Sequence, residues 1–374
     1  MNYIVREFDP ITYDKDLEIL SENNYPLFCG VTQKDISEDI IAKLCWAISK
    51  KSGVIFLKKL IPLEILYKNG HDAGSIGKLW EEHHKSFAEF VMGFSPKNIV
   101  EIGGGHGKIA LECFKINQSI SYTIIEPNSN FKHPNINYID DFFSPKFLDN
   151  QNFDCIIHSH TFEHIYEPHL FLEQINSVVG GGIMIFSLPN MQKWLENKWT
   201  NCLNFEHTIF LNEKVIEFLL VKNSFKILKK FYFNEHSIFY ATIKNEKIKK
   251  ENLSLINEYQ ANKKLFMDMQ DYYQRQITRL NEYITKFDLV YIFGAHLFSQ
   301  YLIYQGLKTQ KIAGILDNNP NKQGKRLYGT KFFVFSPKIL IDKEALIILN
   351  AGVYNEEIKR DLLEINKSLQ IIDF

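Results

Sequence analysis

The sequence predicts an α/β protein with two Rossmann-like, mostly parallel sheets, one in a large central domain and one in a smaller C-terminal domain. Between residues 77 and 244, and again from Phe287 onward, short apolar runs alternate with helical patterns, as in parallel sheets that are covered by helices. A glycine-rich turn follows the first strand of the central block. Residues 246–286 contain no glycine or proline, so we expect a helical connector between the two blocks.

Composition limits the classes of protein to which the chain can belong. Its 374 residues include 43 Lys and Arg against 44 Asp and Glu, and 45% are hydrophobic. This composition predicts an ordered protein of two or three domains. It argues against nucleic acid as a partner, because a nucleic-acid binder usually presents a basic surface. The sequence shows no signal peptide, no membrane-spanning run and no CxxC pair, so we expect a cytoplasmic monomer or homodimer without a membrane partner.

The pattern changes divide the chain into four parts. Residues 1–68 mix short apolar runs with turn residues and show no clear repeat. Residues 69–245 form the central domain, 246–286 the helical connector and 287–374 the C-terminal domain. In the last part we expect strands over 289–293, 311–316 and 345–349.

The first strand of the central domain ends in the glycine-rich turn and leads into a helix over 108–117. Glycines let the backbone turn sharply and approach a ligand, and the helix N-terminus adds positive potential. The second strand ends in Glu126, where a carboxylate can accept hydrogen bonds from a ribose diol. The third ends near Asp140 and Asp141. The expected strands span 98–102, 121–126, 136–143, 153–158 and 181–189, followed by an antiparallel pair over 226–233 and 238–243.

The first turn, Glu101-Ile-Gly-Gly-Gly-His-Gly107, resembles the first motif of class I S-adenosyl-L-methionine-dependent methyltransferases. A dinucleotide-binding fold also combines a glycine turn with a later acid. The acid two residues before the first glycine and the closing antiparallel pair favour the methyltransferases. The resemblance implies S-adenosyl-L-methionine as cofactor, with Glu101, Gly103, Gly105 and Gly107 around its methionyl end, Glu126 on its ribose, Asp140 or Asp141 on its adenine, and His160 as a further cofactor contact.

Two histidine-containing elements follow at the carboxyl edge of the predicted sheet, where ligands bind in open α/β folds. They are His160-Thr-Phe-Glu-His164 and Asn204-Phe-Glu-His207. An imidazole beside a carboxylate suits a general base, and His207 is our first candidate, with His164 as the second. A buried structural histidine explains one such pair equally well.

The whole chain resembles the three-part sugar C-methyltransferases that act on nucleotide-linked keto-deoxysugars. In the C-terminal domain, Lys322-Gln-Gly-Lys325 after a strand ending in Asp317, together with Asn350-Ala-Gly-Val-Tyr-Asn355, carries this resemblance. Members of that family have an N-terminal zinc-binding region, a central methyltransferase domain and a C-terminal Rossmann-like domain. The resemblance therefore covers nearly the entire chain.

This second resemblance implies that Glu206 and His207 are catalytic, with His207 as the base for the proton next to the keto group. Two active-site tyrosines of the family are replaced here. Asn204 stands at the position of the first, and His71 is expected to take the place of the second. Because a phenol helps to stabilise an enolate, these replacements weaken the case for methylation of carbon.

The family's zinc ligands are reduced here to Cys29 and Cys45. A tetrahedral structural zinc site needs four ligands, so we expect the N-terminal region to have lost its metal and to serve as a lid. We expect no metal in the active site either, because class I methyl transfer does not generally need one.

The expected function is C-methylation of a nucleotide-linked keto-deoxysugar through an enolate. Methylation of an oxygen on a sugar or another small polar acceptor is the alternative, and a non-catalytic binding protein with this fold is the third possibility. We expect Asn204, Tyr166 and Trp199 to contact the substrate, although the two aromatic side chains could instead pack in the core. Arg326 is expected to bind the diphosphate of the substrate or to be an exposed loop cation.

Overall fold

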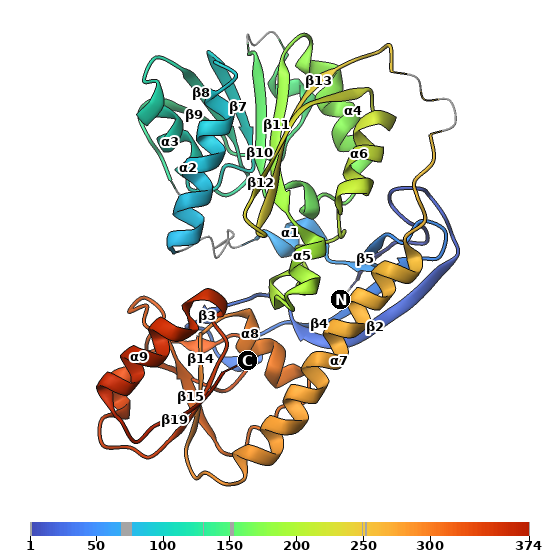
Figure 1. Cartoon of the computed structure of the whole chain (residues 1–374). Helices are drawn as coiled ribbons and strands as arrows, with labels where there is room; N and C mark the ends of the chain where they lie inside the picture. Colours follow the sequence, from blue (N-terminus) through green and yellow to red (C-terminus); the bar gives the residue numbers. More distant parts are fainter. Residues whose placement is uncertain are drawn as a thin grey trace.

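The computed structural model describes residues 2–68, 77–129, 131–149, 153–248, 250 and 253–373. Figure 1 shows two sheet-containing lobes, the central domain above and the C-terminal domain below, with N-terminal strands and the long helix α7 (Tyr259–Ile284) beside the junction. Among the described residues, no helix combines the length and the apolar character needed to cross a bilayer.

The central domain is built on a seven-stranded sheet in the order β12-β13-β11-β10-β7-β8-β9. Helices α2 and α3 pack on one face and α4 and α6 on the other, so the parallel strands are buried on both faces and read as continuous apolar runs. The predicted sheet of parallel strands closed by an antiparallel pair is confirmed. Its strands are β7 (Asn98–Ile102), β8 (Ser121–Ile125), β9 (Ile136–Ile139), β10 (Cys155–Ser159), β11 (Ile183–Pro189), β12 (Phe225–Phe233) and β13 (Ser237–Lys244), and its helices are α2 (Lys78–Met92), α3 (Lys108–Ile116), α4 (Pro168–Val179), α5 (Met191–Glu196) and α6 (Glu213–Lys222).

The N-terminal region forms an antiparallel sheet of β2 (Leu17–Pro26), β4 (Ile41–Ser49) and β5 (Ile55–Leu57). The sequence did not predict this sheet, because β2 carries the polar run Ser21-Glu22-Asn23-Asn24 and a register shift between Ile19 and Ser21. Both interruptions hide the two-residue alternation of a strand. Three small elements accompany the sheet: β1 (Ile4–Val5), which pairs with β6 (Lys59–Leu60), and α1 (Leu63–Leu66).

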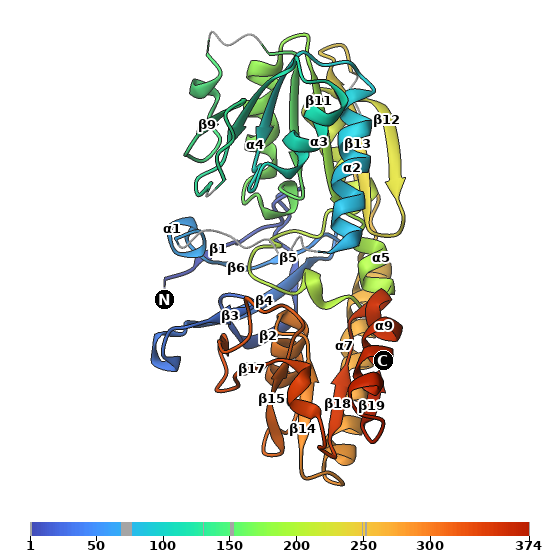
Figure 2. The same cartoon turned by 90° about the vertical axis from the view of Figure 1, so that its left-hand side faces the viewer.

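This N-terminal sheet is buried on both faces. Trp46 and Leu57 belong to a hydrophobic core shared with α7 and the C-terminal domain, whereas Ala47 and Phe56 belong to the core of the central domain. Successive residues of a strand point to opposite faces, so the sheet contributes to both cores. Figure 2 shows its strands crossing between the two lobes. Such a sheet cannot open as a lid without exposing two cores, which argues against the lid expected from the sequence.

The connector contains one helix, α7, which begins at Tyr259. The described residues of the predicted connector that precede it, 246–248, 250 and 253–258, are not helical. Its buried side chains recur at three- and four-residue spacing, which places them on one stripe of the helix. They are Phe266, Met269, Tyr273, Ile277, Leu280 and Ile284.

The C-terminal domain has a parallel sheet in the order β17-β15-β14-β18-β19, with α8 (Leu297–Tyr304) and α9 (Asn355–Ile365). The three predicted strands are present, and two edge strands were missed. A short strand of the C-terminal domain, β16 (Arg326–Leu327), lies outside this sheet. It pairs with β3 (Val31–Thr32) of the N-terminal region. The sheet strands are β14 (Val290–Phe293), β15 (Ile312–Leu316), β17 (Val334–Phe335), β18 (Leu346–Leu349) and β19 (Gln370–Asp373).

Candidate active site

A cavity of about 1180 Å³ lies at the carboxyl edge of the central sheet, between the two lobes. Its walls combine N-terminal residues between Phe28 and Lys34, the loops that follow the central strands, and His296, Leu297 and Tyr328 of the C-terminal domain. Single-ligand pockets usually measure roughly 300–1,000 Å³. The cavity therefore has room for two ligands side by side.

The glycine-rich turn after β7 forms one end of the cavity. A Cβ on Gly103, where φ is +76°, would lie 2.7 Å from Thr161 Oγ1, and one on Gly104 would lie 2.8 Å from an Ile124 methyl group. Larger residues are therefore excluded from this turn. Gly107 does not line the cavity: it precedes α3 with φ +65°, and an added Cβ would meet the Phe131 ring at 2.9 Å. Its role is to shape the turn rather than to touch a ligand.

Glu101 and Glu126 line the same end of the cavity. Glu101 is 1% exposed and accepts a 2.7 Å hydrogen bond from the Tyr122 hydroxyl. Burial raises the pKa of Glu101 to about 7, although the Tyr122 hydrogen bond opposes this rise. Glu126 follows the last residue of β8, and its Oε1 accepts a 3.3 Å hydrogen bond from the Asn128 amide. Both predicted acids therefore lie in the cavity wall beside the glycine turn, and their contact with a cofactor stays a prediction.

Asp140 and Asp141 do not line the cavity, contrary to the prediction for adenine. Asp140 is exposed and forms a 2.8 Å ion pair with Lys132, and Asp141 accepts a hydrogen bond from the Phe142 amide. Phe142 and Phe143 line the cavity instead. The third strand thus contributes aromatic rings to the wall, and its carboxylates face solvent.

The two histidine-containing elements meet at the middle of the cavity. The ring centroids of His164 and His207 lie 5.1 Å apart, and both side chains line the wall with His160. His160 has φ +49°, and its Nε2 lies 2.8 Å from Ser237 Oγ. Burial, followed by the neighbouring histidines, holds the pKa of His160 well below its ordinary value. His160 is therefore neutral at physiological pH and keeps a fixed orientation.

Glu163 lies behind these histidines and is fully buried. Its Oε1 is 3.4 Å from His160 Nδ1 and 3.9 Å from His164 Nε2. Burial raises the pKa of Glu163 to about 7. Ligand atoms of Glu163, His164 and His207 all lie within 4.8 Å of one another. Glu163 was not among the predicted site residues, because the interior position of its side chain depends on the 3-10 turn Phe162–His164.

An N-terminal arginine holds the two histidine loops together. The Arg6 guanidinium donates hydrogen bonds of 2.8 Å to the Thr208 carbonyl and 2.6 Å to the Tyr166 carbonyl. Thr208 follows His207, and its amide donates to the Glu163 carbonyl. Sequence reasoning missed Arg6, although the rarity of arginine in this chain was a usable signal, with five in 374 residues.

Asn204 shapes the His207 loop, because its Oδ1 accepts hydrogen bonds from the Glu206 amide at 2.8 Å and the His207 amide at 2.9 Å. Asn204 and Glu206 also line the cavity; substrate contact by Asn204 and catalysis by Glu206 stay predictions. Tyr166 lines it too, and its hydroxyl donates to the Ile61 carbonyl.

A tyrosine that was not among the predicted site residues, Tyr67, lies in the cavity wall. The Tyr67 hydroxyl is 3.3 Å from His164 Nδ1. His71, proposed as the replacement of a family tyrosine, lies outside the described residues. Tyr67 precedes His71 by four residues, so a tyrosine near this position could have been proposed from the sequence.

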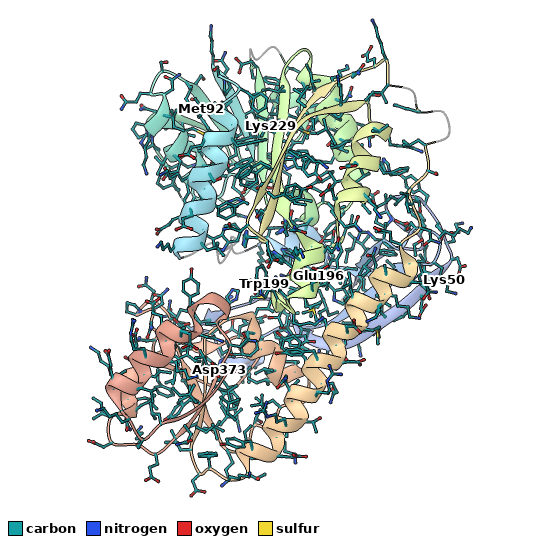
Figure 3. The ribbon with its side chains drawn as sticks, in the orientation of Figure 1. Lys50, Met92, Glu196, Trp199, Lys229 and Asp373 are labelled. Carbon is teal, nitrogen blue, oxygen red and sulfur yellow. The ribbon has the colours of Figure 1, made fainter. Side chains whose placement is uncertain are left out.

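Two predicted substrate contacts are wrong. Trp199 is not part of the cavity wall and packs against the core between the lobes, where Figure 3 labels it; Trp194, 6.0 Å away between ring centroids, lines the cavity instead. Arg326 is buried and forms a two-pronged ion pair with Asp39, with N–O distances of 2.5 and 3.0 Å. Its remaining hydrogen bonds go to the Lys34 and Thr330 carbonyls. Arg326 is therefore committed to the structure rather than to a phosphate.

A family model described as a methyltransferase domain matches residues 78–230. No curated protein matches the sequence significantly. Similar solved structures include the plantazolicin methyltransferase BpumL, with 15% identity over 45% of this chain and 84% of that chain and a TM-score of 0.34. The methyltransferase domain of bacterial CtHen1-C has 12% identity over 45% and 100% of the two chains, with a TM-score of 0.38. A riboflavin-derivative dimethyltransferase, RosA from Streptomyces davawensis, has 13% identity over 44% and 55%, with a TM-score of 0.37.

The family match and the sheet order confirm the predicted class of enzyme: the central domain is an S-adenosyl-L-methionine-dependent methyltransferase domain. The narrower resemblance to nucleotide-sugar C-methyltransferases is not tested by these matches.

Proposed function

We propose that the protein transfers a methyl group from S-adenosyl-L-methionine to a nucleotide-linked keto sugar, at the carbon next to the ketone. The observation that carries this proposal is the composition of the cavity. One cavity is lined by a glycine turn and Glu126, by the group of His164, His207 and Tyr67, and by residues of the N- and C-terminal parts. The four-part division of the chain is part of the same proposal.

The part of the cavity around the glycine turn fits S-adenosyl-L-methionine. The turn Gly103–Gly105 excludes side chains, and a Cβ on Gly105 would have no described atom within 4 Å, so its backbone is open to a ligand. Glu126 stands where a ribose diol is expected to donate hydrogen bonds. The sulfonium of S-adenosyl-L-methionine supplies an already activated methyl group. The task of the protein is therefore to align the acceptor and to exclude water.

Acceptor activation falls to the side chains at the middle of the cavity. We assign His207 as the base that takes the proton from the carbon next to the ketone. Burial, and then the charge of Glu206, raises the pKa of Tyr67 well above its ordinary value. Tyr67 thus stays protonated and can donate a hydrogen bond to the developing enolate oxygen. With S-adenosyl-L-methionine bound, its methyl group would pass from sulfur to the enolate carbon, leaving S-adenosylhomocysteine. Tyr67 would supply a phenol in place of the family tyrosines whose positions are assigned here to Asn204 and His71.

The far end of the cavity is where the nucleotide part of the substrate would bind. Thr32 and Lys34 line it beside Tyr328 of the C-terminal domain, with Glu38 next to them. We propose that Lys34 and Thr32 take the phosphate-binding role expected of Arg326.

Isothermal titration tests the cofactor end. The protein should bind both S-adenosyl-L-methionine and S-adenosylhomocysteine, and Glu126→Gln should weaken binding by roughly 10- to 100-fold, as expected for hydrogen bonds to a charged group. Asp140→Asn, at the same sheet edge but outside the cavity, is the matched control and should bind like the wild type. Absence of binding in the wild type would favour a non-catalytic protein.

Product analysis after incubation with a panel of nucleotide sugars tests the acceptor. A C-methylated product is expected, and without cofactor the enzyme should exchange the proton next to the ketone with deuterium from solvent. His207→Ala should lose turnover by about 10² to 10⁴ with cofactor affinity unchanged. A methyl ether, with no exchange, would show that the acceptor atom is oxygen.

A further inference from the structure

We propose that Glu163, His164 and His207 form a binding site for a divalent transition-metal ion on the cavity wall. Their ligand atoms lie within 4.8 Å of one another, and among the described residues no other group of three or more His, Cys, Asp or Glu side chains is arranged in this way. The site does not rest on the proposed function, because it is defined by the positions of the three side chains alone.

The Glu163 carboxylate is the first argument for a cation at this point. It is fully buried, and within the described parts of the chain neither of its oxygens has a hydrogen-bond partner. Burying a carboxylate without hydrogen bonds is expensive, and its closest polar neighbour is His160 Nδ1, 3.4 Å from Oε1. Two imidazoles stand in front of it, with His164 Nε2 3.9 Å from Oε1. A metal ion between them would satisfy the carboxylate and use the imidazole lone pairs.

The surroundings of His164 are the second argument. A metal-bound histidine commonly donates its other ring N–H to a neighbouring group, which fixes the tautomer and the ring orientation. His164 Nδ1 lies 3.3 Å from the Tyr67 hydroxyl. If His164 carries its proton on Nδ1, then Nε2, the ring nitrogen 3.9 Å from Glu163 Oε1, has a lone pair that can bind a metal ion.

The three ligand side chains need to move only slightly closer together to bind a metal ion. Ligands held about 2.0–2.2 Å from a tetrahedral metal lie about 3.4 Å from one another. Drawing the three side chains together therefore needs shifts of about 1 Å. Rotation of the His164 and His207 rings, both on the cavity wall, supplies such shifts.

Two imidazoles and one carboxylate suit Zn²⁺, Fe²⁺, Mn²⁺ or Co²⁺ and leave coordination positions open. The open side faces the cavity, because His164 and His207 line it and Glu163 lies behind them. An oxygen of the acceptor could bind there. The role of base assigned to His207 above applies to the metal-free protein. When the metal is bound, the coordinating nitrogen of His207 is not available, and the proton of the acceptor would pass to Glu206, the adjoining carboxylate on the wall.

Cobalt titration of the metal-stripped full-length protein tests the site. We expect one Co²⁺ per chain, with the visible bands of a nitrogen–oxygen site and without the intense thiolate charge-transfer band that any of the five free cysteines would give. Glu163→Gln and His207→Ala should each weaken Co²⁺ binding by more than the roughly 10- to 100-fold that loss of a supporting group costs. Tyr67→Phe should fall within that 10- to 100-fold range.

His133→Ala, a half-buried histidine outside the cavity, is the matched control and should leave Co²⁺ affinity unchanged. Circular dichroism and S-adenosylhomocysteine titration establish that each variant is folded. Absence of stoichiometric binding, or binding that all three variants retain at full strength, overturns the metal site. Either result leaves the proposed methyl transfer intact, since cofactor titration and product analysis test it separately.

Discussion

Burial sets the charge of the ionisable side chains around the cavity. His158 and His160 are close together at the end of β10, yet His160 reaches the cavity and His158 lies in the core, with its ring stacked 4.9 Å from that of Phe186. Among the described residues neither ring nitrogen of His158 has a hydrogen-bond partner. Burial lowers the pKa of His158 to about 3. Of these two histidines, His158 is the structural one.

His158→Phe should remove part of the acid sensitivity of the fold. The folded pKa of His158 lies below the ordinary 6.5, so the unfolded chain binds the proton first, and stability falls as the pH drops from about 6.5 towards 3. Between pH 8 and pH 5 this costs about 2 kcal/mol. Urea denaturation of both proteins at these two pH values should show the wild type losing about 2 kcal/mol more than the variant. Parallel losses would mean that His158 does not titrate as its burial indicates.

Residue positions were predictable where a strand end determines them. Glu126 and His164 follow parallel strands, and the carboxyl ends of such strands share one edge, so their meeting at the cavity could be deduced from the sequence. The direction of a side chain within a loop could not be deduced. Asp141 and Phe142 are adjacent, and only the loop conformation decides that the ring lines the wall while the carboxylate faces solvent.

At the scale of elements, the unpredicted N-terminal sheet decides how the lobes are joined. Strand β4 places Trp46 in one core and Ala47 in the other, and the start of α7 packs on the turn between β4 and β5. There the Asn262 side chain donates to the Gly53 carbonyl at 2.9 Å, and the Glu258 amide donates to the Ser52 carbonyl at 3.2 Å. The sequence predicted α7 from its apolar stripe, but its partner depends on contacts distant in the chain.

Gly53→Ala should destabilise the packing of α7 on the turn between β4 and β5. A Cβ on Gly53 would lie 2.4 Å from the Glu258 carbonyl carbon and 2.5 Å from the Tyr259 amide nitrogen, and φ is +78°. Backbone atoms cannot move aside as a flexible side chain can, so we expect a loss of more than about 2 kcal/mol in the free energy of unfolding. Gly30→Ala is the matched control, since Gly30 has φ +89° but no described atom within 4 Å of an added Cβ. Equal losses in the two variants would show that backbone strain alone matters at Gly53.

At the scale of the whole molecule, the cavity exists only because three parts of the chain meet. The glycine turn belongs to the central domain, Tyr67 to the N-terminal region and His296 to the C-terminal domain. The pairing of β3 with β16 keeps the far wall in place. Such a composite wall suits the large, two-part substrate proposed above, because neither lobe alone encloses the cavity.

Arg326→Met tests whether Arg326 holds this wall or binds substrate. The Arg326–Asp39 pair is buried, with side-chain exposures of 7% and 3%. Removing one partner of a buried pair leaves an uncompensated charge and should cost about 3–5 kcal/mol in the free energy of unfolding. Adding Asp39→Asn should recover part of this loss, because the amide carries no charge and its oxygen can still accept the Gly329 amide, now 2.7 Å from Asp39. S-adenosylhomocysteine affinity at the glycine turn should be unchanged in both variants. An Arg326→Met protein of wild-type stability that bound nucleotide sugars more weakly would instead return Arg326 to the phosphate-binding role that its position in the sequence suggested.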